Sequence, residues 1–498
     1  MKNRIRTLAA IIAFLPWLWG CAWLLDAEEN VAAAAEEVIV ATPVSTDTPA
    51  PRPTVTSMAE TVGADGLGDP YYPQLGNGGY DVTHYALDLA FDPDSRSING
   101  TTTITAQATQ NLSAFNLDFS GLKIGAISVD DHPADFSRTG TELTIRPADI
   151  LPAGQLFTIT VDYSGVPQPI VDPGVPFARV GWITAGSGVF VLSEPSGAMS
   201  WYPVNNHPTD KASYTFRITV PKPLLVAANG LLEEKIDNGD TTTFVWEAAD
   251  PMASYLATVN IAEFKMVTEE GPNGLPIRNF FPLDASLRAS EALSPTVAMI
   301  EFFSDILGPY PFEAYGVVVM DANFPGALET QTLSVFGRNA LREGTVAHEL
   351  AHQWLGNSVS PATWQDIWLN EGFATYFEAL WREHSRGSDL FHSEMSDSYD
   401  SIVAAQLPAP GDPSVRGLFG ASVYQRGAWT LHALRLQVGD ELFFEILRVY
   451  YDRFKGGNAG TSDFIAIAEA VSGQDLSDLF DSWLYAAEIP PKPPVRGR

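Results

Sequence analysis

The segment "AHELAHQWLGNSVSPATWQDIWLNEGFATYFE", residues 347–378, contains the residues that decide both the fold and the chemistry of this chain. On an α-helix, residues four positions apart share a face, so His348 and His352 can present both imidazoles to one metal ion. Glu349 lies on the neighbouring face, where it can reach a water molecule beside the metal. A catalytic zinc ion usually has three protein ligands. Glu371, on a second predicted helix, supplies the third.

The composition excludes one class of partner. At 498 residues the chain is long enough for two or three domains. It has 60 acidic and 29 basic residues, a formal charge of −31. A nucleic-acid-binding protein needs a basic surface, so we expect no nucleic-acid partner. A single cysteine leaves no intrachain disulfide to expect.

Residues 1–25 have the layout of an export signal. A basic start, "MKNRIR", precedes the apolar run "TLAAIIAFLPWLWG", and Cys21 follows directly. "LWGC" resembles a bacterial lipobox, which implies lipidation of Cys21 and attachment to a membrane. The apolar run continues to Leu25, so an uncleaved anchor helix and ordinary secretion remain alternatives. All three predict that the body of the protein lies outside the cytoplasm.

The rest of the chain divides by composition and periodicity. Residues 26–68 are rich in Ala, Thr, Pro and Glu, which predicts a disordered linker. Residues 69–265 alternate apolar and polar positions, as at Tyr85, Leu87 and Leu89, which predicts a β-sandwich or saddle domain.

The second half has a different period. Residues 266–490 have mainly helical spacing, with a strand-like run at 315–321 and Thr461 as an expected helix N-cap. Residues 491–498 form a tail. The fold class is therefore multidomain α+β, with a β-rich first domain and a mainly helical second domain.

Four motifs together resemble one family. "HELAHQW" followed by "WLNEGFA" at this spacing is similar to the aminopeptidase N family of gluzincin zinc metallopeptidases, which includes leukotriene A4 hydrolase. "GALET" (326–330) matches the family's Gly-Ala-Met-Glu-Asn motif, and "VYQRGA" (423–428) matches a downstream tyrosine motif. "SEPSGAMSWYP" (193–203) matches a stretch of the family's β domain. The resemblance covers residues 69–490 and implies a thermolysin-like catalytic domain.

The resemblance implies a role for each catalytic position. One zinc ion per chain would bind His348, His352 and Glu371 and polarise the scissile carbonyl and a water molecule. Glu349 would accept the proton of that water and pass it to the leaving amine. Tyr424 would donate a hydrogen bond to the oxyanion of the tetrahedral intermediate.

The resemblance also implies how substrate binds. Glu329 and Glu194 would bind the α-ammonium group of a peptide with a free N-terminus, because two converging carboxylates need a cation. Gly326 and Ala327 would leave an edge-strand backbone free to pair with the substrate.

The sequence departs from the family pattern in several places. Leu328 and Thr330 replace the usual Met and Asn of the amine-binding motif, and Met199 stands where the family often has Arg. The sequence ends at "IPPKPPVRGR", residues 489–498, about where the catalytic domain would close, whereas family members usually continue into a helical C-terminal domain that covers the cleft. We therefore expect a more open site.

The leading hypothesis is a zinc aminopeptidase. One alternative is an open-cleft zinc endopeptidase, which would lack the converging pair Glu194 and Glu329. A second is a non-catalytic binding module, which would have a damaged zinc-ligand set. An epoxide hydrolase like the leukotriene enzyme is a further alternative.

Overall fold

The computed structural model describes residues 61–493, except 187, 286–290, 323 and 325. The predicted export signal with Cys21, and residues 26–60 of the predicted linker, lie outside the described residues. Within the described part, no helix combines the length and the apolar character that a membrane span requires.

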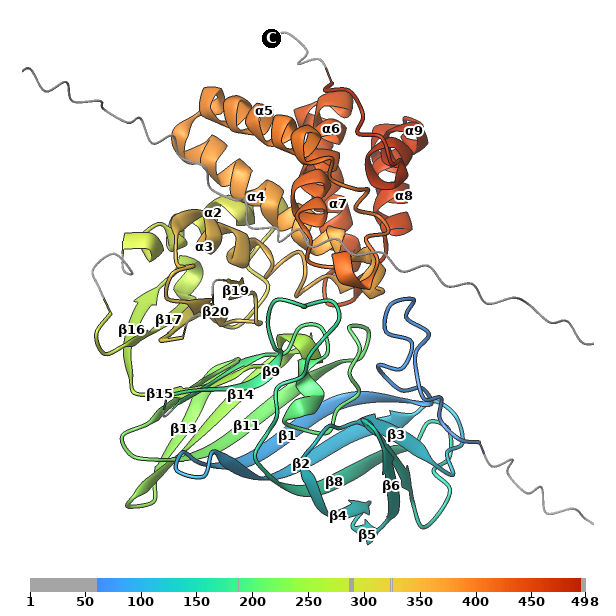
Figure 1. Ribbon diagram of the computed structural model, residues 1–498, viewed down its shortest axis with the longest axis vertical. Coiled ribbons are helices and arrows are strands. Elements are labelled where there is room, and N and C mark those ends of the chain that lie inside the picture. Colours follow the sequence, from blue (N-terminus) through green and yellow to red (C-terminus); the bar gives the residue numbers. More distant parts are fainter. Residues whose placement is uncertain (1–60, 187, 286–290, 323, 325, 494–498) are drawn as a thin grey trace, which may run out of the picture. The chain divides into compact units, whose positions relative to one another are not determined.

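The first domain is built from three β-sheets (Figure 1). The largest has eight strands in the order β13 (Leu231–Asp237), β14 (Thr241–Ala253), β11 (Lys211–Pro221), β1 (Tyr80–Asp92), β2 (Ser97–Ala108), β8 (Leu156–Gly165), β4 (Lys123–Val129) and β5 (His132–Pro133). A second sheet has the order β12 (Leu225–Ala228), β15 (Val259–Ala262), β10 (Gly188–Leu192) and β9 (Gly181–Ala185). The third has the order β3 (Phe115–Asp118), β7 (Glu142–Arg146) and β6 (Asp135–Thr139).

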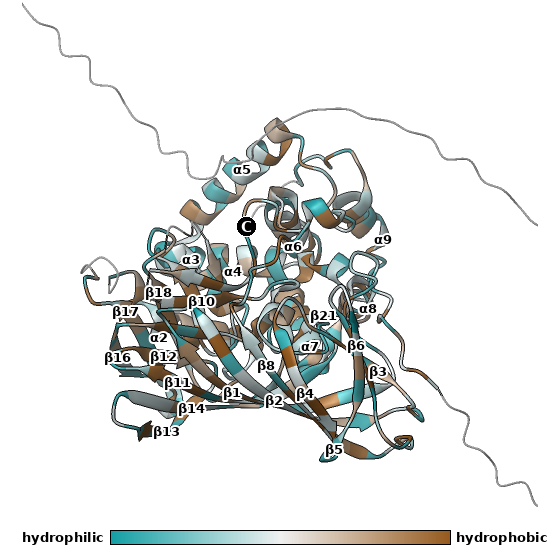
Figure 2. Ribbon diagram, turned by 60° about the horizontal axis from the view of Figure 1, so that its bottom comes forward, coloured by the Kyte–Doolittle hydropathy of each residue, from teal (hydrophilic) through white to brown (hydrophobic). Residues whose placement is uncertain are grey.

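The predicted alternation of buried and exposed positions is confirmed in the large sheet. Tyr85, Leu87 and Leu89 of β1 are buried in the core, and Asp88 between them is exposed. Figure 2 shows hydrophobic and hydrophilic residues alternating along these strands. Successive side chains of a strand point to opposite faces, so a strand with one buried face has apolar residues at every second position.

The predicted linker ends earlier than residue 68. Val62 forms a β-bridge with Ala114, and the Gly63 amide donates to the Ala114 carbonyl over 2.9 Å. A Cβ at Gly63 would lie 2.4 Å from the Gly78 carbonyl oxygen, so glycine permits this close main-chain approach. The composition was a poor guide here because main-chain pairing needs no apolar side chain.

The second domain begins with a mixed sheet. Its strands, in order, are β16 (Phe264–Glu270), β17 (Pro276–Pro282), β18 (Tyr315–Met320), β20 (Ser334–Gly337) and β19 (Ala327–Leu328). The predicted strand at 315–321 is confirmed as β18. Since β16 already belongs to this sheet, the domain boundary lies just before Phe264 rather than after residue 265.

Helices are the main regular secondary structure of the second domain, as predicted (Figure 1). They are α2 (Thr296–Leu307), α3 (Glu343–Ala351), α4 (Trp368–Arg386), α5 (Ser388–Ala405), α6 (Gly427–Val438), α7 (Asp440–Phe454), α8 (Thr461–Ser472) and α9 (Ser477–Phe480). Two short strands, β21 (Ser360–Pro361) and β22 (Asn458–Ala459), pair in parallel.

The predicted N-cap at Thr461 is wrong by one position. Gly460 is the N-cap of α8, and Thr461 is its first helical residue. The Thr461 amide and hydroxyl both donate to Asp366 Oδ1 over 2.8 Å. Asp463, three residues after the N-cap, also accepts from the Gly460 amide over 2.9 Å. The helix start is therefore satisfied both by a local carboxylate and by Asp366 from another part of the fold, and only the local one could be read from the sequence.

Lys211 of β11 connects the β domain to the loop that follows α3. Its Nζ donates to the carbonyl oxygens of Asn357 and Ser358, each over 3.0 Å. Burial lowers the pKa of Lys211 to about 7, because a low-dielectric environment disfavours the charged form.

This burial predicts a pH-dependent contribution to stability. Above pH 7 the folded lysine releases a proton that the unfolded lysine, with a pKa near 10.4, still holds, so stability rises with pH in this window. Between pH 7 and pH 9, the free energy of unfolding of wild type should rise by about 1–2 kcal/mol more than that of Lys211→Met. Urea denaturation at both pH values measures the difference. Equal pH dependence of the two proteins would contradict the assignment.

Candidate active site

The three predicted metal ligands converge. His348 Nε2 lies 3.1 Å from His352 Nε2 and 3.2 Å from Glu371 Oε2, and His352 Nε2 lies 3.4 Å from Glu371 Oε2. Atoms about 2.0–2.1 Å from a zinc ion at tetrahedral angles lie about 3.3–3.4 Å apart. The triangle of two nitrogens and one oxygen therefore fits zinc.

The loop after α3 orients the second histidine. His352 Nδ1 lies 3.1 Å from the carbonyl oxygen of Leu355. A carbonyl can only accept, so Nδ1 carries the proton and the Nε2 lone pair is directed at the metal position. Gly356, at φ +139°, leaves room for this imidazole, since a Cβ there would lie 3.0 Å from Nδ1.

The electrostatics of the triad also favour a cation. Burial alone would raise the pKa of Glu371, but hydrogen bonds with His348 and His352 lower it to about 2. Burial alone would lower the pKa of His352, but the charges of Glu329, Glu371 and Glu349 raise it to about 10. Positive charge is thus stabilised where these side chains meet.

Three further glutamates surround the triad. Ligand atoms of Glu329, Glu349 and His352 lie within 4.8 Å of one another, and so do those of Glu194, Glu329 and Glu371. Glu194, Glu329 and Glu349 are all buried. Burial, reinforced by the other carboxylates, raises the pKa of Glu194 and Glu349 well above the usual range.

Two residues that the sequence reasoning missed hold Glu329 in place. Gln353 Nε2 and Asn357 Nδ2 donate to the Glu329 carbonyl oxygen over 3.0 Å and 2.7 Å. Gln353 Oε1 also accepts from the Thr332 amide over 2.9 Å. Both residues lie just after the His-Glu-x-x-His motif. Buried amide side chains at such positions commonly satisfy nearby main-chain groups, which is the only signal the sequence offered.

The predicted substrate-pairing segment is an edge strand. Ala327 and Leu328 form β19, which ends the five-stranded sheet and pairs only with β20 within that sheet. Gly326 accepts a hydrogen bond from the Gly337 amide over 3.0 Å. Thr330, a departure from the family motif, donates to the Leu333 carbonyl and is satisfied locally.

Tyr424 lies beside the metal triad. Its ring stacks on that of His348, with centroids 6.0 Å apart and planes inclined by 21°. The turn that carries it, Ser422–Arg426, is π-helical. A Cβ at Gly372 would lie 3.0 Å from Gly427 Cα. These two glycines allow α4 and α6 to approach closely, which brings Glu371 and Tyr424 to one site.

Arg426 fixes the same turn and was not singled out from the sequence. It is fully buried. Its guanidinium donates to five main-chain carbonyls, those of Leu407, Ser482, Trp483, Ala486 and Glu488. A planar group with five donors suits such a set of acceptors. The segment 482–488 thereby braces the turn that carries Tyr424.

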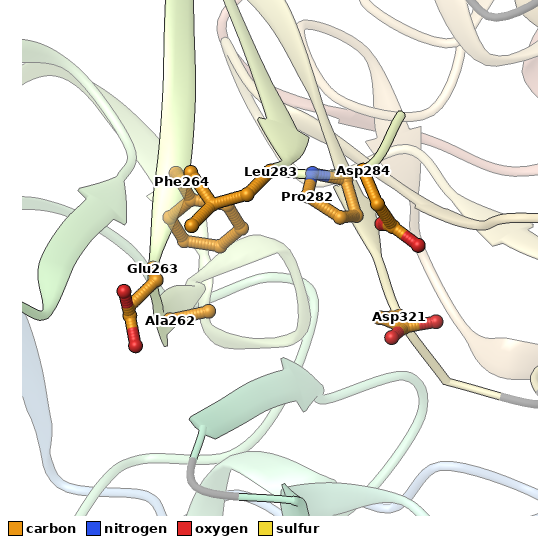
Figure 3. A pocket seen from close by; sticks show the side chains of 7 residues that line it. All are labelled: Ala262, Glu263, Phe264, Pro282, Leu283, Asp284 and Asp321. Atoms are coloured by element: carbon orange, nitrogen blue, oxygen red, sulfur yellow. The ribbon is translucent and has the colours of Figure 1, made fainter. Parts of the chain in front are cut away.

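A separate open pocket of about 260 Å³ lies where β15, β16 and β17 meet the end of β18 (Figure 3). Its lining contains none of the predicted site residues and is formed by Ala262, Glu263, Phe264, Pro282, Leu283, Asp284 and Asp321. Arg338 pairs with both Asp284 and Asp321, at 2.7 Å and 3.0 Å. The acidic wall of this pocket is therefore already neutralised in part.

Comparison with known proteins settles the family. The peptidase family M1 domain matches residues 291–483, and the peptidase M1 N-terminal domain matches residues 81–256. The M1 zinc metallopeptidase of Deinococcus radiodurans is 31% identical, with a TM-score of 0.82, and the match covers 87% of this chain and 100% of that one. The chain belongs to peptidase family M1. Zinc is the metal of these relatives, and the donor triangle agrees with it.

Other M1 relatives share parts of the chain. A mutant of the Deinococcus radiodurans enzyme bound to a Tyr-Ser-Ala substrate is 31% identical, with a TM-score of 0.80, over 86% of this chain and 99% of that one. Rat glutamyl aminopeptidase is 28% identical over 58% of this chain and 33% of its own length. Rice aminopeptidase M1-A is 25% identical over 80% of this chain and 49% of its own length. The chain thus spans about a third to a half of these curated relatives.

The site predicts how metal content should respond to substitution. Wild type should retain about one zinc ion per chain after dialysis. Glu371→Gln removes an anionic ligand and should weaken zinc binding by at least about 100-fold. Loss of a residue that only hydrogen-bonds to a metal ligand typically lowers metal affinity by about 10–100-fold, and loss of a ligand itself should cost more. Glu349→Gln, as the matched control in the same cluster, should retain zinc. Elemental analysis with chelator competition measures both, and equal zinc affinity in the two variants would contradict the ligand assignment.

Proposed function

We propose that this protein is a zinc aminopeptidase that removes N-terminal residues from peptides. The observation that carries the proposal is the pair of buried carboxylates, Glu194 and Glu329, whose oxygens lie within 4.8 Å of each other and of Glu371. The charges that raise the pKa of Glu194 all belong to carboxylates. Such a cluster favours a cationic ligand, and a peptide α-ammonium group is one.

The position of the pair relative to the metal triad determines which bond is cut. If the α-ammonium group binds Glu194 and Glu329, the first peptide bond of the substrate lies next to His348, His352 and Glu371. A blocked N-terminus has no charge to bind there. The edge strand β19, beginning at Ala327, offers main-chain groups to the extended substrate. The peptide-bound Deinococcus radiodurans relative supports a peptide ligand for this fold.

The mechanism follows from the residues around the triad. When bound, zinc acts as a Lewis acid that polarises the scissile carbonyl and lowers the pKa of a water molecule. Glu349, whose pKa burial raises, accepts the proton of the attacking water and delivers it to the departing amine. Tyr424, beside His348, donates its hydroxyl proton in a hydrogen bond to the oxyanion.

The two main alternatives each predict that part of this site should be missing. An endopeptidase has no use for two buried acids that require a free amine. A non-catalytic binding module has no need of an intact ligand set together with Glu349. Both features are retained here, which supports the aminopeptidase.

Kinetics on free and blocked substrates test the proposal. A charge-assisted hydrogen bond to the α-ammonium group contributes about 1.5–3 kcal/mol, so Glu329→Gln should lower kcat/KM on amino acid anilides about ten- to a hundredfold with normal zinc content. N-acetylation should cost wild type at least as much and the variant much less. The exposed Glu269→Gln serves as the control for loss of one charge.

Two outcomes of these assays would contradict the proposal. Cleavage of N-acetylated peptides at internal bonds, unchanged by Glu329→Gln, would establish an endopeptidase. No hydrolysis of any peptide by zinc-loaded wild type would favour the binding module.

A further inference from the structure

Two carboxylates of the β domain, far from the zinc triad in sequence, are forced together by strand pairing. Asp118 of β3 lies directly opposite Glu142 of β7. The main chain of Asp118 bonds instead to Val204, while Phe119 N donates to the Thr141 carbonyl over 2.7 Å. Asp118 and Glu142 are therefore a non-hydrogen-bonded pair, whose Cα atoms are about 4.5 Å apart and whose side chains share one face. Like charges in this arrangement repel.

Among the residues that the structure describes, no basic side chain forms a salt bridge with either carboxylate. Asp118 is fully buried. Its Oδ2 accepts from Gly76 N, Asn77 Nδ2 and Asn206 N over 3.1, 3.2 and 2.9 Å. Its Oδ1 and Glu142 Oε1 are buried, and no donor among the described residues reaches either atom.

Two amide oxygens at the same place are also without a donor. Asn116 precedes Asp118 by two positions in β3, so both side chains point to one face. Asn77 lies over that face, since its own Nδ2 contacts Asp118. Both asparagines are at least 95% buried, and Oδ1 of each lacks a donor within the described part of the chain. Four buried oxygens, two of them from neutral side chains, thus lack a donor within the described part of the chain, on residues that the strand register and the Asn77–Asp118 hydrogen bond bring to one face of β3.

The charges reinforce the geometry. Burial raises the pKa of Glu142 to about 8, with the charges of Asp118 and Asp65 adding to it. Burial also raises the pKa of Asp118 to about 7, although hydrogen bonds from Asn206 and Gly76 oppose the shift. Asp65 lies in the glycine-rich residues 63–68, directly after the β-bridge between Val62 and Ala114 that precedes β3. A third acid is therefore close by.

We propose that Asp118, Glu142, Asn77 and Asn116 form a binding site for a calcium ion. All four donors are oxygens, which suits a hard cation, and neither histidine nor cysteine belongs to the set. Calcium accepts a flexible, irregular set of carboxylate and amide oxygens, whereas magnesium requires near-octahedral geometry. With two direct carboxylates, the dissociation constant should be on the order of 10⁻⁴–10⁻³ M.

The proposed ion would act on more than the β domain. The Asn206 amide binds Asp118, and Asn206 Nδ2 donates to the Ser196 carbonyl over 3.0 Å. Ser196 lies two residues after Glu194 in the segment that reaches the zinc triad. A calcium ion at Asp118 would therefore brace the main chain that positions Glu194.

Thermal unfolding of the zinc-loaded full chain tests the site. Raising CaCl₂ from 0.1 to 10 mM at constant ionic strength should raise Tm by about 2 °C in wild type, since the ion binds only the folded form. MgCl₂ should have a smaller effect. Calorimetric titration with CaCl₂ should give one ion per chain that leaves the zinc content unchanged.

Variants decide between calcium and a shared proton. Glu142→Gln should abolish the calcium-dependent rise in Tm, and the exposed Glu234→Gln should retain it. Asp118→Asn tests the other carboxylate, but it also alters three hydrogen bonds, so Glu142→Gln remains the decisive variant. A wild-type Tm that is unaffected by calcium, with Glu142→Gln more stable than wild type at neutral pH, would establish a shared proton and overturn the proposal. An equal calcium-dependent rise in Glu142→Gln would overturn it as well.

Discussion

The active site depends on one electrostatic constraint: four glutamates are buried within a few ångströms of one another. Glu194, Glu329, Glu349 and Glu371 meet there with two histidines, and within the described part of the chain no arginine or lysine forms a salt bridge with any of the four. Buried carboxylates are strongly destabilising unless cations or protons compensate them. A zinc ion on the triad would compensate half of the formal charge. Under the proposed function, a substrate ammonium group would reduce the remainder, and the need for this second cation would make the site selective for a free N-terminus.

The rest of the fold keeps these acids together. Gln353 and Asn357 hold the main chain of Glu329, and the contact of Gly372 with Gly427 brings α4 against the turn that carries Tyr424. The buried guanidinium of Arg426 ties that turn to residues 482–488. Most of these contacts are hydrogen bonds to main-chain carbonyls. The amide groups of Gln353 and Asn357 fix the main chain of Glu329 without adding a charge to the cluster.

The sequence predicted which side chains group around His348 and His352, because the spacing of the motifs has a direct geometric meaning. His348 and Glu371 lie on two adjacent helices, and His352 is the C-cap residue of the first. The motif matches indicated that Glu194, Glu329 and Tyr424 lie around them. The alternation of apolar and polar residues in β1 predicted a strand, because one face of that strand is buried. Periodicity could not reveal contacts between distant segments. Three such contacts join residues far apart in the chain: the β-bridge between Val62 and Ala114, the hydrogen bonds from Thr461 to Asp366 at the start of α8, and those from Arg426 to the carbonyls of residues 482–488. Local patterns contain no information about such partners.

The most direct test of the account is a crystal structure of the zinc-loaded protein with a bound free amino acid such as L-arginine or L-tryptophan. The α-ammonium nitrogen should lie about 2.7–3.2 Å from a carboxylate oxygen of both Glu194 and Glu329. The α-carboxylate should lie beside His348, His352 and Glu371. An amino acid whose ammonium group points to solvent, with Glu194 and Glu329 contacting neither it nor another cation, would contradict the account.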